Sequence, residues 1–329
     1  MTWLPLYEEA LASLSAAAGY YNRNVGVRTT DGKVNVRIPL AAADIMDIRL
    51  WREEEVLGCI RSRVGRIPEL RHVSQDPRFQ VHDFIEGSVL NDLSPRGRDV
   101  PVHVLTDVVT LMDQLARIPE GTLPVLPGRW PDSGDTAAFG RSLAELTQSV
   151  HRSHAQEYCG VFAEFGIPKD PLAVIENLWS GLTTRPFGLL HADLHRRNMI
   201  VSDGVTWFLD WELALWGDPM YEIAIHLHKM DYPKRQRAEV LRQWRERLPG
   251  RFTAGPDDDL HLYGTHERIK SAIVDTVRYS KQLATAGPPQ RAALVGRLAA
   301  KLNAVRPVWG LPPDMTPERV AAALSRWSE

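Results

Sequence analysis

The sequence is poor in cysteine, in long apolar runs and in net charge. Its two cysteines, Cys59 and Cys159, are too few for a disulfide framework, and they do not form a close pair of the metal-binding kind. No apolar run is long enough to cross a bilayer, and the N-terminal stretch carries Glu8 and Glu9 where a secretion signal would be apolar. The net charge of -2 gives no sign of a nucleic-acid or membrane partner. These absences predict a cytoplasmic protein with neither kind of partner.

The remaining composition is that of an ordinary globular protein. Apolar residues make up 44% of the 329 residues and charged residues 24%, which is enough to bury a large core. A chain of this length forms one large domain or two lobes, and no feature of it indicates an oligomeric state.

Apolar periodicity predicts short strands near the N-terminus and helices after them. Lys33, Asn35 and Arg37 alternate with apolar residues, as in a half-buried strand, and Asp31-Gly32 is typical of the hairpin turn before it. The Pro- and Gly-rich residues 119–137 are expected to form a loop. Helices are expected over residues 5–18, 47–63, 102–116, 138–154, 171–182, 219–231, 233–248, 260–283, 288–303 and 317–324.

The most informative stretch predicts a tight hairpin near the middle of the C-terminal half. Residues 199–201 and 205–209 are apolar enough for two strands, and Ser202-Asp203-Gly204 between them is a strong turn signal. Asp193 and Asn198 precede the first strand, whereas Asp210 ends the second. Because a hairpin brings its outer ends together, these three oxygen-bearing side chains are expected to meet.

These residue types suit phosphoryl transfer. Mg²⁺ prefers oxygen ligands and often shares them with substrate phosphates, so Asn198 and Asp210 are the candidate metal ligands. Asp193 is the candidate catalytic residue that accepts the proton of an attacking hydroxyl. His191, in the same loop, is expected to brace it by packing and hydrogen bonding. The alternative is a hairpin with ordinary turn carboxylates and a satisfied histidine.

The segments HADLHRRNMIV, FLDWE and GDPMYEIA resemble the aminoglycoside phosphotransferase and choline kinase family, which has a protein-kinase-like fold. One departure is Glu222, where many members have Asp in the helix that supports the catalytic loop. The resemblance implies an α+β, bilobal fold. The small N-lobe, with an antiparallel sheet and a helix, would span residues 1–86, and the larger, mostly helical C-lobe would span residues 87–329.

The resemblance also implies a phosphate-gripping cation on the third strand and a Glu that pairs with it. By position the cation is Arg37, with Lys33 as the second choice, and the partner is Glu53, with Glu54 or Glu55 as alternatives. Read without the resemblance, Arg37 is an exposed basic residue on an edge strand and the Glu run is a solvated helix face.

Further nucleotide-binding candidates are less specific. No G-x-G-x-x-G motif is present, and residues 22–26, including Asn24, lie where a phosphate-covering loop would be. His82 and Phe84 belong to the strand that would lead into the hinge between lobes. Because backbone atoms would bind the purine there, the sequence does not distinguish ATP from GTP as the donor.

The resemblance implies a small hydroxyl-bearing acceptor rather than a protein, and Gly217 follows Asp210 too closely for an activation segment. An antibiotic acceptor, such as an aminoglycoside, an aminocyclitol or a similar natural product, is expected, with a role in resistance or self-protection. A metabolite kinase of the choline, homoserine or sugar type is the alternative, and a non-catalytic pseudokinase is a third reading. The acceptor-binding candidates are Glu212, Trp216, His228, Asp231 and Glu267.

Overall fold

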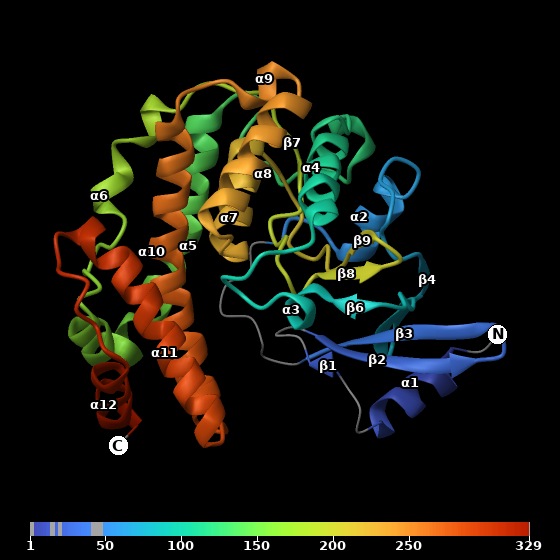
Figure 1. Cartoon of the computed structure of the whole chain (residues 1–329), viewed down its shortest axis with the longest axis horizontal. Coiled ribbons are helices and arrows are strands. Elements are labelled where there is room, and N and C mark those ends of the chain that lie inside the picture. Colours follow the sequence, from blue (N-terminus) through green and yellow to red (C-terminus); the bar gives the residue numbers. More distant parts are fainter. Residues whose placement is uncertain (1–2, 14–16, 19–21, 41–48, 329) are drawn as a thin grey trace.

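The computed structural model describes residues 3–13, 17–18, 22–40 and 49–328. An antiparallel five-stranded sheet in the order β1-β2-β3-β5-β4 forms the N-terminal part, and helices form most of the rest (Figure 1). The predicted α+β architecture is therefore confirmed. The sheet strands are β1 (Ala17–Ala18), β2 (Asn22–Thr29), β3 (Gly32–Pro39), β4 (Leu70–Gln75) and β5 (Arg78–Asp83).

The alternation of residues along β3 divides the sheet into two chemically different faces. Apolar side chains of β2, β3 and β5 pack against helix α1 (Leu4–Ala12) in a small separate core. The opposite face is polar, because Asn24, Arg37 and Gln80 are register partners across β2, β3 and β5. Separation of apolar and polar side chains onto opposite faces is what a period of two residues predicts.

Two predicted helices of this part are shorter than expected. Helix α1 ends at Ala12 rather than at residue 18, because Ser13 is extended and β1 pairs with β2. Helix α2 (Glu53–Ile60) begins after the extended Arg52, so the predicted start at residue 47 was wrong for residues 49–52, while residues 47 and 48 lie outside the described part. In both cases extended backbone overrode helical propensity.

A second, three-stranded sheet connects the two parts of the molecule. Strand β6 (Ser88–Val89) pairs with β8 (Met199–Ser202), which forms the predicted hairpin with β9 (Val205–Phe208). The turn is confirmed, with Asp203 and Gly204 both at positive φ. A two-stranded antiparallel sheet forms from the segments on either side of this hairpin in the chain, β7 (Gly188–Leu190) before it and β10 (Leu215–Gly217) after it.

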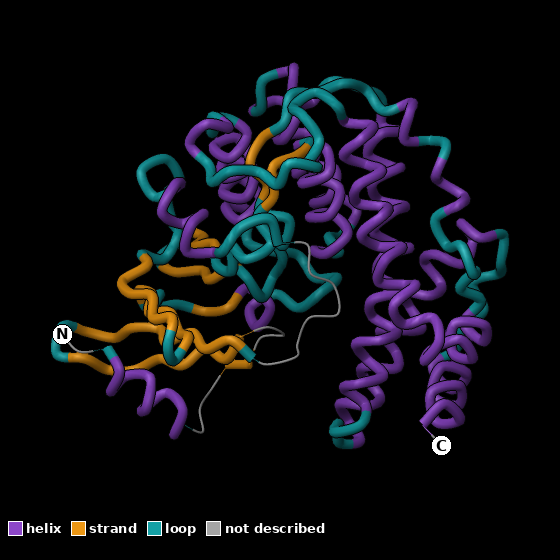
Figure 2. Tube along the Cα trace, turned by 180° about the vertical axis from the view of Figure 1, so that it is seen from behind, coloured by secondary structure: helices purple, strands orange, loops and turns teal. Residues whose placement is uncertain are grey.

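The C-terminal part is built from long helices around one large core (Figure 2). The predicted helix 171–182 is wrong: only two short turns form there, α6 and η2. The other predicted helices are present, with some different ends. The elements are α3 (Leu90–Leu93), α4 (Val102–Ala116), η1 (Glu120–Thr122), α5 (Thr136–Phe165), α6 (Ala173–Glu176), η2 (Trp179–Gly181), α7 (Pro219–Met230), α8 (Lys234–Arg247), α9 (Gly250–Thr253), α10 (Asp257–Leu283), α11 (Pro288–Val305), η3 (Arg306–Trp309) and α12 (Pro317–Ser328).

Helix α7 starts at a buried polar cluster that fixes its direction. Asp218 caps the helix by accepting a 3.0 Å hydrogen bond from the Met220 amide. The same carboxylate accepts hydrogen bonds from the Arg185 guanidinium and from the Tyr263 hydroxyl of α10. This anchoring orients α7 so that its far end reaches the loop before β8. Among the described helices, none combines the length and apolarity that a membrane span needs.

Candidate active site

The hairpin gathers the three predicted side chains as the sequence suggested. Asn198 donates from Nδ2 to the backbone oxygen and to Oδ2 of Asp193, each at 3.0 Å. The Leu209 amide donates to the Asn198 carbonyl at 2.9 Å, which ties the start of β8 to the end of β9. Asp210 follows with a left-handed backbone, φ 66°. Asp193, Asn198 and Asp210 therefore surround one end of the hairpin.

His191 supports this loop through the contacts of its buried ring. Its Nε2 lies 3.1 Å from the Leu209 carbonyl oxygen and its ring lies 4.5 Å from that of Trp211, centroid to centroid. Burial lowers the pKa of His191 to about 4, so the ring is neutral near pH 7. A neutral ring that bonds a backbone carbonyl has the bracing geometry that we expected for His191.

Glu222 of α7 supports the same loop. Its Oε2 accepts a 2.9 Å hydrogen bond from the amide of Ala192, a residue that the loop holds at φ 57°. Burial raises the pKa of Glu222 to about 7. The longer side chain thus still reaches the loop backbone, although the resemblance placed an Asp here.

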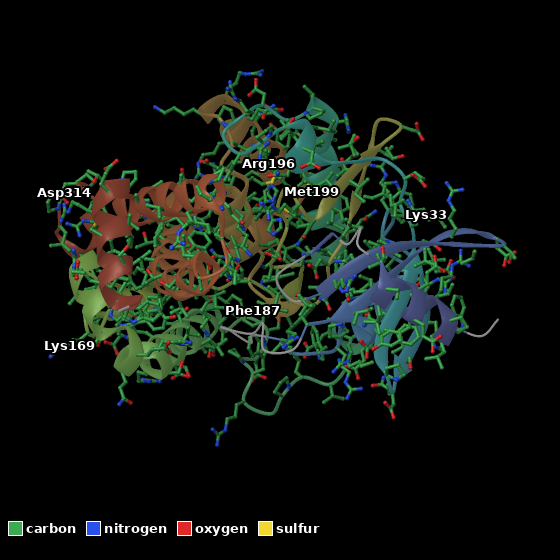
Figure 3. All side chains as sticks on the ribbon, turned by 90° about the horizontal axis from the view of Figure 1, so that it is seen from below. Lys33, Lys169, Phe187, Arg196, Met199 and Asp314 are labelled. Carbon is green, nitrogen blue, oxygen red and sulfur yellow. The ribbon has the colours of Figure 1, made fainter. Side chains whose placement is uncertain are left out.

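Arg196 supplies a further support that the sequence did not indicate. The guanidinium is buried and donates to the carbonyls of Met230, Ser94 and Arg98, at 3.0, 2.8 and 2.8 Å. Figure 3 shows Arg196 next to Met199, between the sheet side that carries Lys33 and the far end that carries Asp314. Arg196 thereby joins the loop to the segment after β6 and to the end of α7.

On the side of the N-terminal sheet, the Arg37 guanidinium contacts three carboxyl groups. We name these four residues the Arg37 group: Arg37, Glu53, Asp210 and Glu212. The Arg37 Nε lies 3.3 Å from a carboxylate oxygen of Glu53, and its Nη2 lies 2.5 Å from Oδ1 of Asp210 and 3.3 Å from Oε2 of Glu212. The expected pairing of the strand cation with Glu53 is thus present, at the start of α2. Burial and the nearby Asp210 raise the pKa of Glu212 to about 8.

Two hydrogen bonds hold the carboxylates of the Arg37 group in place. The Trp211 amide donates to Glu53 at 2.9 Å, and the Asn22 side chain donates to Glu212 at 2.9 Å. Glu212 was predicted to bind the acceptor. It instead lies against Arg37, so its placement favours the nucleotide side.

On the side of helix α7, Asp193 contacts two basic side chains, Lys229 and His195, that the sequence did not indicate. We name these three residues, together with Asn198, the Asp193 group. Lys229 of α7 forms an ion pair with Oδ1, and His195 Nε2 lies 3.6 Å from Oδ2. Burial alone would raise the pKa of Asp193, but Lys229 and His195 lower it well below its usual range. Asp193 is therefore ionised at any pH near neutrality, as a proton acceptor must be.

The predicted magnesium ligands have suitable donor chemistry. Asn198 uses its amide nitrogen on Asp193, which leaves its side-chain oxygen as the atom that can ligate a cation. Asp210 offers a carboxylate nearby. Within the described residues, no group of three or more His, Cys, Asp or Glu side chains is arranged to hold a metal. A site of Asn198, Asp210 and nucleotide phosphates therefore fits Mg²⁺, which uses few protein ligands.

The remaining nucleotide candidates lie on or beside the polar face of the sheet. Asn24 is in β2, not in a loop, and accepts a 3.2 Å hydrogen bond from Asn35. His82 is buried beside Gln80, and burial lowers its pKa to about 3. Phe84 follows β5 and lies under the Lys33 ammonium, 3.5 Å from the ring centroid.

The acceptor candidates are divided between the core and the surface. Trp216 is buried in the main core, and the prediction that it contacts an acceptor finds no support in this placement. Glu267 is fully buried, and His228 bonds Ser271 at 2.9 Å. Asp231 ends α7, is exposed, and lies 3.6 Å from Arg96.

The antiparallel N-terminal sheet and the mostly helical C-terminal part form the bilobal, kinase-like architecture. Residues 14–257 match the family model described as the phosphotransferase enzyme family. This match covers most of the chain, and the protein belongs to that family. No curated protein sequence matches the chain significantly.

Solved structures with the same fold are only distantly related in sequence. Choline kinase LicA from Streptococcus pneumoniae is 14% identical with a TM-score of 0.57, covering 92% of this chain and 98% of its own. Macrolide 2'-phosphotransferase MphH from Brachybacterium faecium is 18% identical with a TM-score of 0.53, covering 92% and 98%. Aminoglycoside phosphotransferase APH(4)-Ia is 17% identical with a TM-score of 0.56, covering 99% and 98%. These likenesses establish the fold.

Proposed function

We propose that the protein transfers the γ-phosphoryl group of ATP or GTP to a hydroxyl of a small molecule of the antibiotic or natural-product type. The observation that carries this proposal is the meeting of Asp193, Asn198 and Asp210 at one end of the hairpin, with Lys229 holding Asp193 ionised. The nucleotide would lie between an N-lobe of residues 1–86 and a C-lobe of residues 87–329.

Each group has a defined part in the transfer. Asp193 orients the acceptor hydroxyl and takes its proton as the oxygen bonds to the γ-phosphorus. The bond from that phosphorus to the β–γ bridging oxygen breaks, and the nucleoside diphosphate leaves with the electron pair. Mg²⁺, held by Asn198 and Asp210, would supply positive charge beside the phosphates. Arg37, positioned by Glu53, would bind the same phosphates from the sheet side.

An antibiotic acceptor is supported by similar structures that bind an antibiotic or are named for one. A variant of APH(4)-Ia was solved with ADP and hygromycin B, and MphH is named for a macrolide. The alternative is a metabolite kinase, because LicA is named a choline kinase. A choline site needs aromatic rings around a quaternary ammonium, but Trp211, Trp216 and Tyr221 are all buried in the core. Homoserine or a sugar is therefore the better metabolite candidate.

The test is a coupled assay of nucleoside diphosphate release with ATP and with GTP. The acceptors are aminoglycosides, aminocyclitols, macrolides, nucleoside and peptide antibiotics, choline, homoserine and simple sugars. Turnover of one antibiotic at micromolar KM supports a resistance or self-protection enzyme. Turnover of a metabolite alone supports the alternative, whereas nucleotide binding without any turnover or hydrolysis supports a pseudokinase.

A further inference from the structure

One histidine of the loop before β8 lies beside the predicted catalytic carboxylate, and the proposed transfer gives it no part. The Nε2 atom of His195 is 3.6 Å from Oδ2 of Asp193, and the two side chains are 27% and 15% exposed. Both side chains therefore reach solvent next to each other. Any group that approaches Asp193 from solvent also comes close to the His195 ring.

The hydrogen bonding of the ring determines which nitrogen carries its proton. The Arg197 backbone amide donates to Nδ1 of His195 at 3.2 Å. Because an amide N–H can only donate, Nδ1 offers its lone pair and the proton of the neutral ring is on Nε2. A second proton would have to bind Nδ1, opposite the Arg197 N–H, and burial also lowers the pKa of His195. The ring is therefore a neutral donor whose one N–H lies next to Asp193.

This N–H is not bonded to any acceptor within the described part of the chain. The Asp193 oxygen at 3.6 Å is too far for a hydrogen bond, and the one hydrogen bond of the His195 ring is at Nδ1. Nε2 is also absent from the buried polar atoms that lack a partner, so solvent reaches it. An accessible donor without an acceptor is available to a ligand.

The loop holds the His195 ring in place from both sides. The Asn198 amide donates to the His195 carbonyl at 2.9 Å, and the Leu194 carbonyl accepts a 3.0 Å hydrogen bond from Nδ1 of the buried His226. On the other side, three backbone carbonyls fix the Arg196 guanidinium. A donor that is fixed before the substrate binds needs no rearrangement during the reaction, and such donors stabilise the charge of a transition state best.

The two oxygens of Asp193 differ in what an acceptor would meet. Oδ1 pairs with the Lys229 ammonium, whereas Oδ2 accepts from the neutral Asn198 amide at 3.0 Å and is the oxygen nearer to His195. A hydroxyl that donates to Oδ2 therefore has the His195 N–H beside it. The phosphorus that bonds to this hydroxyl carries three further oxygens, and negative charge spreads over them during transfer.

From this geometry we propose that His195 is a catalytic residue, and that its Nε2–H donates a hydrogen bond to an oxygen of the phosphoryl group during its transfer. The proposal rests on the proposed function and adds a donor on the acceptor side of that group. The acceptor hydroxyl gives its proton to Asp193 as its oxygen bonds to the γ-phosphorus. The bond to the β–γ bridging oxygen breaks, and its electron pair leaves with the diphosphate. His195 keeps its own proton throughout and does not act as a base.

The first experiment uses three substitutions that separate the two nitrogens of the ring. Asn imitates the Nδ1 side of histidine, Gln places an amide N–H near the position of Nε2, and Ala removes both. His195→Ala and His195→Asn are expected to lower kcat about 10²–10³-fold with nearly unchanged KM values, as for the loss of one preorganised donor. His195→Gln should recover at least about tenfold of this loss.

The control for these rates is another histidine. His261→Ala, at an exposed position of α10, should have the kcat and KM of wild type. Diphosphate release with the best acceptor gives the rates, and Tm shows that each variant is folded. An unchanged kcat for His195→Ala, equal losses for all three substitutions, or a loss confined to KM would overturn the proposal.

The second experiment examines the wild-type ring by NMR with ¹⁵N-labelled histidine. His195 is assigned by the signals that are missing from His195→Gln. The ring is expected to carry its proton on Nε2 alone near neutral pH. Aluminium fluoride with ADP or GDP, an analogue of the phosphoryl group during transfer, should shift the Nε2 resonance more than the diphosphate alone does. A proton on Nδ1, or an unchanged Nε2 resonance when the analogue is bound, would contradict the assigned role.

A binding measurement distinguishes failure of this proposal from failure of the proposed function. Titration calorimetry gives the affinities for ADP and GDP in the presence of Mg²⁺, with and without aluminium fluoride. His195→Asn is expected to weaken binding of the diphosphate with aluminium fluoride about 10- to 100-fold, and binding of the diphosphate alone little. Equal affinities of wild type and His195→Asn would overturn the role of His195 even if no acceptor is turned over. Absence of nucleotide binding, or of hydrolysis and transfer to every acceptor, would instead contradict the proposed function.

Discussion

The Arg37 group and the Asp193 group have opposite charge patterns. In the Arg37 group one guanidinium meets three carboxyl groups, and Glu212 keeps its proton near pH 7 because burial and the nearby Asp210 raise its pKa to about 8. In the Asp193 group one carboxylate meets an ammonium, an imidazole and an amide. The two groups lie on the two sides of the hairpin end, where Asp210 and Asp193 come together.

This difference indicates that the two groups suit different ligands. The crowded carboxyl groups suit a divalent cation and its nucleotide, because the positive charge of the metal ion favours their ionised forms. Asp193, whose negative charge is balanced by Lys229, remains ionised without a metal and can accept a proton.

Asp193→Asn should lower kcat by about 10²–10⁴-fold, because the amide cannot accept the hydroxyl proton. Nucleotide affinity should be largely unchanged, since the Arg37 group remains intact. The measurement is diphosphate release with the preferred acceptor, together with titration calorimetry of the nucleotide. Asp203→Asn, in the hairpin turn, is the control and should have wild-type activity. A wild-type kcat for Asp193→Asn would contradict the role of Asp193 as the proton acceptor.

Arg37→Met should destabilise the protein by about 3–5 kcal/mol, because three carboxylates then remain without their buried cation. Nucleotide affinity should also fall. Urea unfolding without nucleotide measures the first effect. Adding Glu212→Gln to Arg37→Met should recover part of the stability by removing one of the three buried carboxyl groups. Arg28→Met, at an exposed position on β2, is the control. A loss no larger than that of the control would mean that the three carboxylates are not held together by Arg37.

The pH dependence of stability should report the proton that Glu212 keeps among the carboxyl groups around Arg37. The folded pKa of Glu212, about 8, lies above its ordinary value of 4.5, so the folded protein keeps a proton that the unfolded chain releases. Its contribution is complete below pH 4.5 and is lost as pH rises to about 8. Glu212→Gln should therefore be more stable than wild type by about 2–4 kcal/mol at pH 8.5, but not at pH 4.5. Urea unfolding at both pH values, with Glu86→Gln as an exposed control, tests this, and identical pH slopes would contradict it.

The smallest effect is expected at the support of the Asp193 group. Glu222→Asp shortens the side chain and should leave the Ala192 amide without its acceptor, at a cost of about 1–2 kcal/mol. Glu222→Gln keeps an acceptor oxygen and should cost less. Thermal unfolding and kcat are measured for both. If the two variants behave alike, the hydrogen bond to Ala192 is not what Glu222 contributes.

Part of the site was predictable because its geometry is local. The turn at Asp203-Gly204 brings the ends of one hairpin together, so Asp193, Asn198 and Asp210 meet whatever the rest of the chain does. The polar face of the sheet follows in the same way from the alternation along β3. Helix ends were less predictable, as α1 and α2 show, because strand pairing and extended backbone decided them.

The sequence by itself determined the hairpin, the loop before it and the family to which the chain belongs, because these depend on residues close together in the chain. Only the tertiary structure placed Lys229 against Asp193, 36 residues away, and Glu212 against Arg37, 175 residues away. Those contacts depend on how α7 is anchored at Asp218 and how the sheet faces the hairpin. The charge balance of the site was therefore decided by packing.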